Sequence, residues 1–93
     1  MVYMSNKNIV NIHQEQIFLH KDEYYYDILR KNIRKYRTKK NLTQQELADL
    51  AELSREYVCD IENKKRNKHP SIATIGRIAD GMKINIGDLF KEQ

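Results

Sequence analysis

Apolar residues recur at helical spacing between residues 22 and 41. The recurring positions lie three or four residues apart, with charged residues between them: Tyr26, Leu29, Ile33 and Tyr36. This spacing places the four side chains on one face of a helix. The pattern therefore predicts an amphipathic helix from Asp22 that ends near Lys40 and Asn41, where its terminal cations suit the negative end of the helix dipole.

A second and a third helix are predicted on either side of a short break. Thr43 and Glu46 have the spacing of a capping box, in which the hydroxyl and the carboxylate each satisfy an orphan backbone amide. The buried side of this second helix is predicted to consist of Leu47, Ala48, Leu50 and Ala51. Ser54 can cap the third helix, which ends at Asn63. Its inner face carries Val58, Ile61 and Glu62.

Two more helices are predicted toward the end of the chain. Ser71, which follows Pro70, can cap the fourth. Its apolar positions are Ile72, Ile75, Ile78, Ala79 and Met82. Asn85, with Asp88 three residues later, can cap a short last helix that contains Leu89 and Phe90. The whole pattern predicts an all-α domain of five helices.

The first part of the chain has a different character. Its apolar residues neither alternate cleanly nor follow a helical period: Ile9, Val10, Ile12, Ile17, Phe18 and Leu19. Their β-propensity favours a short hairpin or an extended β arm. We therefore predict two parts, an N-terminal extension or arm at residues 1–21 and a helical domain at residues 22–93.

Charge is distributed unevenly along this chain of 93 residues, a length typical of one domain. The formal net charge is +4, with −1 in residues 1–26 and +5 in residues 27–93. One cationic cluster comprises Arg30, Lys31, Arg34, Lys35, Arg37, Lys39 and Lys40, and a second comprises Lys64, Lys65, Arg66 and Lys68. Each cluster alone is better explained as a solvated surface. Two clusters flanking one exposed helix favour a polyanionic partner.

Several classes of protein are disfavoured by what the sequence lacks. A single cysteine forms no internal disulfide, and no apolar run approaches the ~20 residues of a membrane span, so a cytoplasmic location is expected. No metal-ligand spacing relates the four candidate ligands, which are Cys59, His13, His20 and His69. A P-loop, paired dinucleotide glycines and a nucleophile elbow are also missing. We therefore expect no metal, no cofactor and no enzymatic activity.

The segment LTQQELADLAELSREYVCDIENKKRN, followed by PSIATIGRIADGMKINIGDLF, resembles the lambda-repressor and Cro type of helix-turn-helix domain. The resemblance covers about residues 27–90. It implies two short helices at a steep angle, one lying across a DNA backbone and the next, at about residues 54–62, entering the major groove. Ala48 suits this arrangement, because helices that cross closely require a small side chain.

The resemblance also implies roles for individual residues. The implied base-reading residues are Arg55, Glu56 and Asp60, with Tyr57 beside them. The implied contacts to the DNA backbone are Thr43, Gln44, Ser54, Asn63, Lys65 and Arg66. Arg37 and Glu62 match a buried ion pair between the first and third helices.

Physical chemistry supports these roles but leaves an alternative for the acids. Arg55 can donate two hydrogen bonds to guanine, and Glu56 or Asp60 can accept one from cytosine. The two acids could equally serve to orient a neighbouring cation. Two features depart from the family pattern: Glu52 stands where the turn usually has glycine, and Lys68 with His69 forms a two-residue insertion.

The expected function is sequence-specific regulation of transcription by a homodimer on a DNA operator with two-fold symmetry. The expected dimer surface comprises Met82, Ile84, Ile86 and Phe90. These residues could instead close the core, and the N-terminal arm could then pair across the two-fold axis of the dimer. Controller proteins of restriction-modification systems and phage or mobile-element repressors are equally similar. The main alternative function is that of a protein-interaction module, such as an antitoxin or an antagonist of another regulator. RNA binding is the third and lowest-ranked function.

Overall fold

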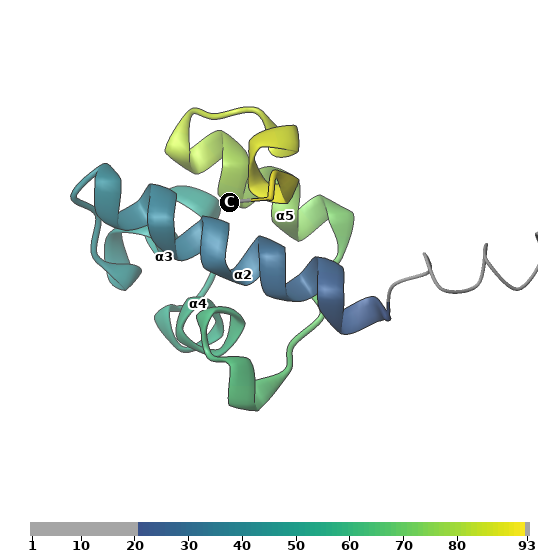
Figure 1. Cartoon of the computed structure of the whole chain (residues 1–93). Helices are drawn as coiled ribbons and strands as arrows, with labels where there is room; N and C mark the ends of the chain where they lie inside the picture. The colour runs from purple at the N-terminus through teal and green to yellow at the C-terminus, as the bar shows by residue number, and fades with distance from the viewer. Residues whose placement is uncertain (1–20, 93) are drawn as a thin grey trace, which may run out of the picture.

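Four α-helices and two short 3₁₀ helices form the computed structural model, which describes residues 21–92. In chain order they are α2 (Asp22–Lys39), α3 (Gln44–Ala51), α4 (Arg55–Glu62), η1 (Lys64–Arg66), α5 (Ile72–Met82) and η2 (Ile86–Phe90). Figure 1 shows α2 crossing the middle of the molecule, with α5 above it and α4 below it. The all-α prediction is confirmed, since no strand occurs within residues 21–92. The predicted hairpin or arm lies outside the described residues.

The predicted caps account for where the helices begin. The Thr43 hydroxyl accepts a hydrogen bond from the Glu46 amide at 3.0 Å, and the Glu46 carboxylate accepts one from the Thr43 amide at 2.8 Å. Ser54 and Ser71 each accept a bond from the amide three residues ahead, at 3.1 and 3.2 Å. These local bonds satisfy amides that have no partner inside the helix, so the sequence determines the start of α3, α4 and α5.

Three helices end in the same left-handed turn. Its central residues have φ values of 60°, 59° and 59°: Asn41, Glu52 and Lys83. The amide of the next residue donates to a carbonyl five residues back in each case, and that residue packs against the core: Leu42, Leu53 and Ile84. Glu52 thus takes the left-handed conformation for which glycine is usual, at a cost of about 1 kcal/mol. The turn between α3 and α4 is therefore left-handed in spite of this residue.

The core lies where α2, α3, α4, α5 and η2 meet. It comprises Leu29, Ile33, Leu47, Ala48, Ala51, Val58, Ile61, Ile75, Ile78, Ala79, Met82 and Leu89. The prediction that Leu50 belongs to it is wrong, because Leu50 is 54% exposed. At 3.6 residues per turn, Leu50 lies about 100° from the centre of the buried stripe of α3. Ile72, in the first turn of α5, is 68% exposed.

The predicted fifth helix is a 3₁₀ helix of five residues rather than an α-helix. The side chain of Asn32, which is fully buried on α2, holds it in place by donating to the carbonyls of Leu89 at 2.9 Å and Lys91 at 2.8 Å. Asp88 stabilises its start by accepting from the Asn85 amide. A hydrogen bond from the Lys91 ammonium lowers the pKa of the Asp88 carboxyl and raises the pKa of Lys91.

His69, one of the two residues predicted to form an insertion before Pro70, packs against the start of α2. The His69 ring stacks on the Tyr26 ring, with centroids 4.1 Å apart and planes 7° from parallel. Pro70 itself is fully buried. His69 and Pro70 therefore hold the loop between α4 and α5 against the domain.

Candidate nucleic-acid interface

An arginine on α2 fixes the C-terminal end of α4. The Arg37 guanidinium donates to both carboxylate oxygens of Glu62, at 2.7 and 3.0 Å, and to the carbonyl of Leu42 at 2.8 Å. The two side chains are only 11% and 4% exposed. Gln44, at the start of α3, donates to the same carboxylate at 3.1 Å. The pair therefore joins α2, α3 and α4 at one point, in a largely desolvated setting.

A second arginine of α2 holds the same end of α4, and sequence reasoning missed it. Arg30 is 6% exposed and donates through Nε to the carbonyl of Ile61 at 3.2 Å. Its charge is compensated by Asp27, one turn earlier on α2, which also lies 3.6 Å from the ammonium of Lys64. The sequence analysis placed Arg30 in the first cationic cluster, which was expected to face solvent or a polyanionic partner. The only local signal against that assignment was an acid three residues before it.

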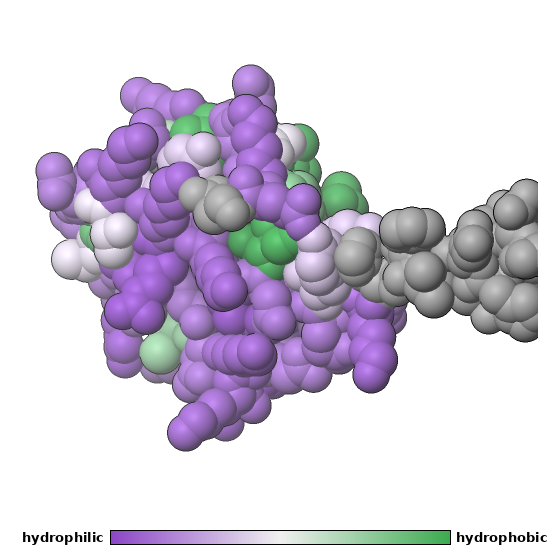
Figure 2. Space-filling view, viewed as in Figure 1, coloured by the Kyte–Doolittle hydropathy of each residue, from purple (hydrophilic) through white to green (hydrophobic). Residues whose placement is uncertain are grey.

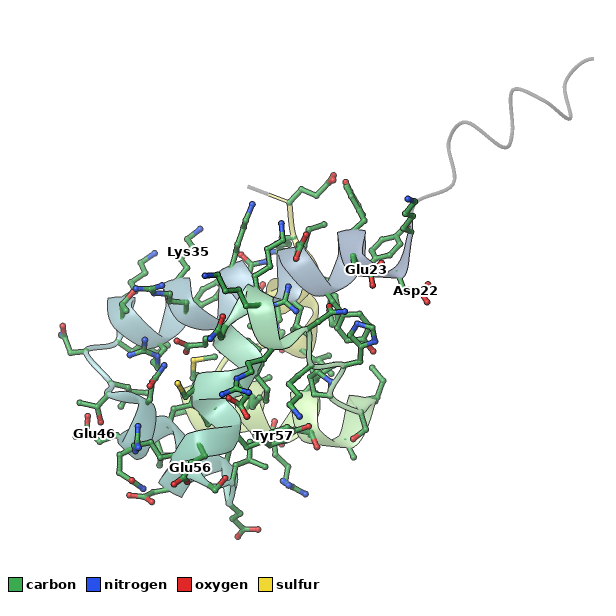
Figure 3. The ribbon with its side chains drawn as sticks, turned by 90° about the horizontal axis from the view of Figure 1, so that it is seen from below. Asp22, Glu23, Lys35, Glu46, Glu56 and Tyr57 are labelled. Atoms are coloured by element: carbon green, nitrogen blue, oxygen red, sulfur yellow. The ribbon has the colours of Figure 1, made fainter. Side chains whose placement is uncertain are left out.

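The N-terminal half of α4 presents side chains that are not engaged by the rest of the domain. Arg55 and Glu56 are exposed, and neither makes a side-chain hydrogen bond or ion pair within residues 21–92. Figure 3 shows Glu56 and Tyr57 on α4 in a view from below. Tyr57 is half-buried and packs against the core, so it is less accessible than Arg55 and Glu56. The structure thus brings Arg55 and Glu56 together at one accessible helix start.

Asp60 is placed differently from the other base-reading candidates. Its carboxylate lies 3.5 Å from the guanidinium of Arg66, a residue predicted to contact the DNA backbone. The Arg66 side chain remains 65% exposed. This geometry fits the alternative in which Asp60 orients a neighbouring cation.

The candidate backbone contacts lie at the starts of α3 and α4 and just after α4. The hydroxyls of Thr43 and Ser54 accept capping bonds, so each retains its own proton for donation to an outside acceptor. Asn63 accepts from the amide of Lys65 at 3.0 Å through its side-chain oxygen, which leaves its NH₂ group as a donor. Gln44 uses one of its two amide hydrogens on Glu62. Every one of these groups can still donate to a phosphate.

The predicted dimer residues divide into buried and exposed members. Met82 is 1% exposed and belongs to the core, so its assignment to an interface is corrected. Ile84 is half-buried because it closes the left-handed turn after α5. Ile86 and Phe90, on η2, are 39% and 37% exposed and remain accessible.

Residues 21–92 contain neither a candidate metal-binding cluster nor a helix suited to span a membrane. No group of three His, Cys, Asp or Glu side chains there could hold a metal ion. None of the helices between residues 21 and 92 is long and apolar enough to cross a membrane. Figure 2 shows a face covered mostly by hydrophilic residues, with small hydrophobic patches.

α3 and α4 are two short helices joined by a tight left-handed turn. The start of α4 is exposed, and α2 holds its other end. This arrangement defines a helix-turn-helix unit. A family model described as helix-turn-helix matches residues 33–89. The chain belongs to this family, which is of the Cro and C1 repressor type, and the resemblance seen in the sequence is confirmed.

Two similar proteins agree with this assignment, and one solved structure shares the fold. Control protein C.SmaI of Serratia marcescens is 33% identical over 67 residues, covering 72% of this chain and 77% of its own length. The immunity repressor protein of Bacillus phage phi105 is 36% identical over 61 residues, covering 66% of this chain. The match spans only 41% of that repressor. The fold resembles the clp gene regulator ClgR from C. glutamicum, with a TM-score of 0.63, 22% identity and coverage of 70% and 82% of the two chains.

Proposed function

We propose that this protein is a sequence-specific DNA-binding regulator of transcription, acting as a homodimer on an operator with two-fold symmetry. The observation that carries the proposal is the start of α4, where Arg55 and Glu56 are exposed and uncommitted while Arg30 and Arg37 hold the other end of the helix. A rigid helix start with free hydrogen-bonding groups suits base edges in the major groove. The relatives named as a repressor and a gene regulator support the same function.

The central test is selection of bound duplexes from a random DNA pool, repeated with two variants. Arg55→Ala is expected to relax preference at one base position, with a loss of about 1 to 3 kcal/mol on the preferred site. Gln44→Ala is expected to weaken all sites about equally, because phosphate contacts carry no sequence information. If both variants weaken binding uniformly, Arg55 does not contact a base.

A protein-interaction module is the second candidate function, and the acidic groups on α4 favour it. Glu56 has no cationic partner within the described residues, and a phosphate backbone would repel it. Titration of the protein with duplex DNA against salt separates the two functions. Phosphate contacts give a slope of log affinity on log salt of about −0.9 per contact, whereas binding to a protein does not require this dependence.

The proposed dimer uses the exposed apolar part of η2. Two copies with recognition helices one helical turn apart, about 34 Å, would multiply the discrimination available to one. The double substitution Ile86→Asp and Phe90→Asp is expected to convert the dimer into a monomer, because it places charge on this surface. Sedimentation equilibrium measures the outcome.

A chain that lacks residues 1–20 serves as the comparison in the dimer experiment. It is expected to remain dimeric if η2 forms the interface. A monomeric truncated chain, together with an unchanged dimer in the η2 variant, would instead assign dimerisation to the N-terminal segment.

A further inference from the structure

An apolar groove of about 310 Å³ lies between the start of α2, the start of α5 and η2. Its walls include Tyr25, Tyr26, Pro70, Ile72, Ile75 and Phe90. Figure 1 shows the start of α5 above the first turns of α2, where these elements meet. Within residues 21–92, no Lys, Arg, Asp or Glu side chain lines the groove. A charged partner such as a phosphate backbone therefore finds no counter-charge there.

The groove has buried walls and an exposed rim. Pro70 is fully buried, and Ile75 is 2% exposed. Tyr25, Ile72 and Phe90 are 51%, 68% and 37% exposed. Five large hydrophobic side chains are exposed within residues 21–92, and three of them share this groove. Single apolar side chains on a surface are ordinary, whereas a cluster around a hollow indicates a place that another apolar group covers.

The N-terminal segment joins the domain one helical turn away from this groove. Lys21 precedes α2 in an extended conformation, and Tyr25 is the fourth residue of that helix. The two residues are therefore about 6 Å apart along the helix axis. Phe18 stands three residues before Lys21, a stretch that spans up to about 10 Å when extended. A side chain at this position is thus within reach of the rim of the groove.

The chemistry of the same stretch fits the groove. Residues 16–20 contain no Lys, Arg, Asp or Glu, and their centre is the apolar run Ile17, Phe18 and Leu19. The residue before a helix cap often packs against the fourth residue of the helix, which here is Tyr25. More distant apolar residues, such as Val10, would have to close a longer loop at a greater cost in entropy.

We infer that residues 17–19 dock into the apolar groove of their own chain, with the Phe18 ring against Ile72. This contact holds the start of α5 against α2 and covers apolar surface in proportion to the area that it buries. It is independent of the proposed DNA binding. Ile86 does not line the groove, so that part of η2 remains available to a second copy.

Urea unfolding of the full chain tests the contact through a double-mutant cycle. Phe18→Ser is expected to lower the urea midpoint by about 0.5 to 1 M, because it removes most of the buried apolar area. Ile72→Ser is expected to lower it by about 0.5 M, since serine and isoleucine have similar helix propensities and only the covered surface is lost. The double variant is expected to be no less stable than Phe18→Ser alone, because both substitutions remove one contact. Additive shifts, or no shift for either single variant, would overturn the inference.

Val10→Ser is the matched control, because it removes an apolar side chain from the same segment farther from Lys21. It is expected to leave the midpoint and the Ile72 methyl resonances unchanged, whereas Phe18→Ser shifts those resonances. Nuclear Overhauser effects between the Phe18 ring and the Ile72 methyl groups are expected within one chain in a mixture of isotope-labelled and unlabelled protein. Effects that appear only between chains would place the segment of a second copy in the groove and reject docking within one chain. Equal perturbation by Val10→Ser would reject the assignment to residues 17–19.

Discussion

Glu62→Ala is expected to lower the free energy of unfolding by about 3 kcal/mol or more, because it strands the Arg37 guanidinium in a setting where that side chain is 11% exposed. Arg37 would keep its bond to the Leu42 carbonyl but lose both carboxylate bonds. Gln44 would lose its partner as well. Urea unfolding followed by circular dichroism measures the change in midpoint.

Two further variants make this experiment decisive. Glu56→Ala removes an exposed acid from the same helix and is expected to change stability by no more than about 0.5 kcal/mol. The double variant Arg37→Met with Glu62→Ala removes both charges and is expected to be more stable than Glu62→Ala alone, since no buried charge remains unpaired. An unmoved midpoint for Glu62→Ala would show that the pair contributes no more than an ordinary surface pair, about 0 to 1 kcal/mol.

Asn32→Leu is expected to cost about 3 kcal/mol, because it removes the donor for two carbonyls while keeping a similar side-chain volume. Leu89 and Lys91 are the residues whose carbonyls lose this donor, and the site is buried at the contact between α2 and η2. Thermal and urea unfolding measure the loss. The adjacent exposed residue provides the control, since Lys31→Ala should leave stability nearly unchanged.

This variant also connects stability to assembly. η2 carries Ile86 and Phe90, the exposed residues of the proposed dimer surface. Releasing η2 from Asn32 is therefore expected to weaken the dimer together with the fold. A variant of full stability would mean that water or neighbouring groups satisfy the two carbonyls in place of the amide.

The helix starts could be predicted because their causes are local. A serine or threonine side chain bonds an amide within three residues of itself, so Thr43, Ser54 and Ser71 each identify a start without knowledge of the fold. The apolar periods were likewise sufficient to find most of the core. The fifth element was placed correctly, but its 3₁₀ form depends on contacts with Asn32 from far away in the chain.

Solvent exposure was harder to predict, because it depends on which other elements pack against a given face of a helix. Leu50 and Ile72 are apolar and follow the helical period, yet no element of the described structure covers them. Met82 and Ile84 gave the opposite result. Both were candidates for the dimer surface or for the core. Met82 lies in the core at the end of α5, and Ile84 packs against the core from the turn that follows.

The polar links between helices could not be derived from spacing at all. Arg37 and Glu62 are 25 residues apart, and only resemblance to a family suggested that they meet. Arg30 and the Ile61 carbonyl are 31 residues apart, and no pattern in the sequence connected them. Such links join segments that come together only when the chain folds. The sequence alone therefore does not show that a charged residue within a basic run is buried.

The two arginine links to the end of α4 also bear on how quickly this surface can engage a duplex. A helix held at its carbonyl end and capped at its start needs no refolding step, so complex formation requires only rotamer changes in a few long side chains. Little backbone entropy is lost at that moment. The encounter rate is then expected to depend on diffusion and on attraction by the two cationic clusters, and discrimination between duplexes is expected mainly in the lifetime of each complex.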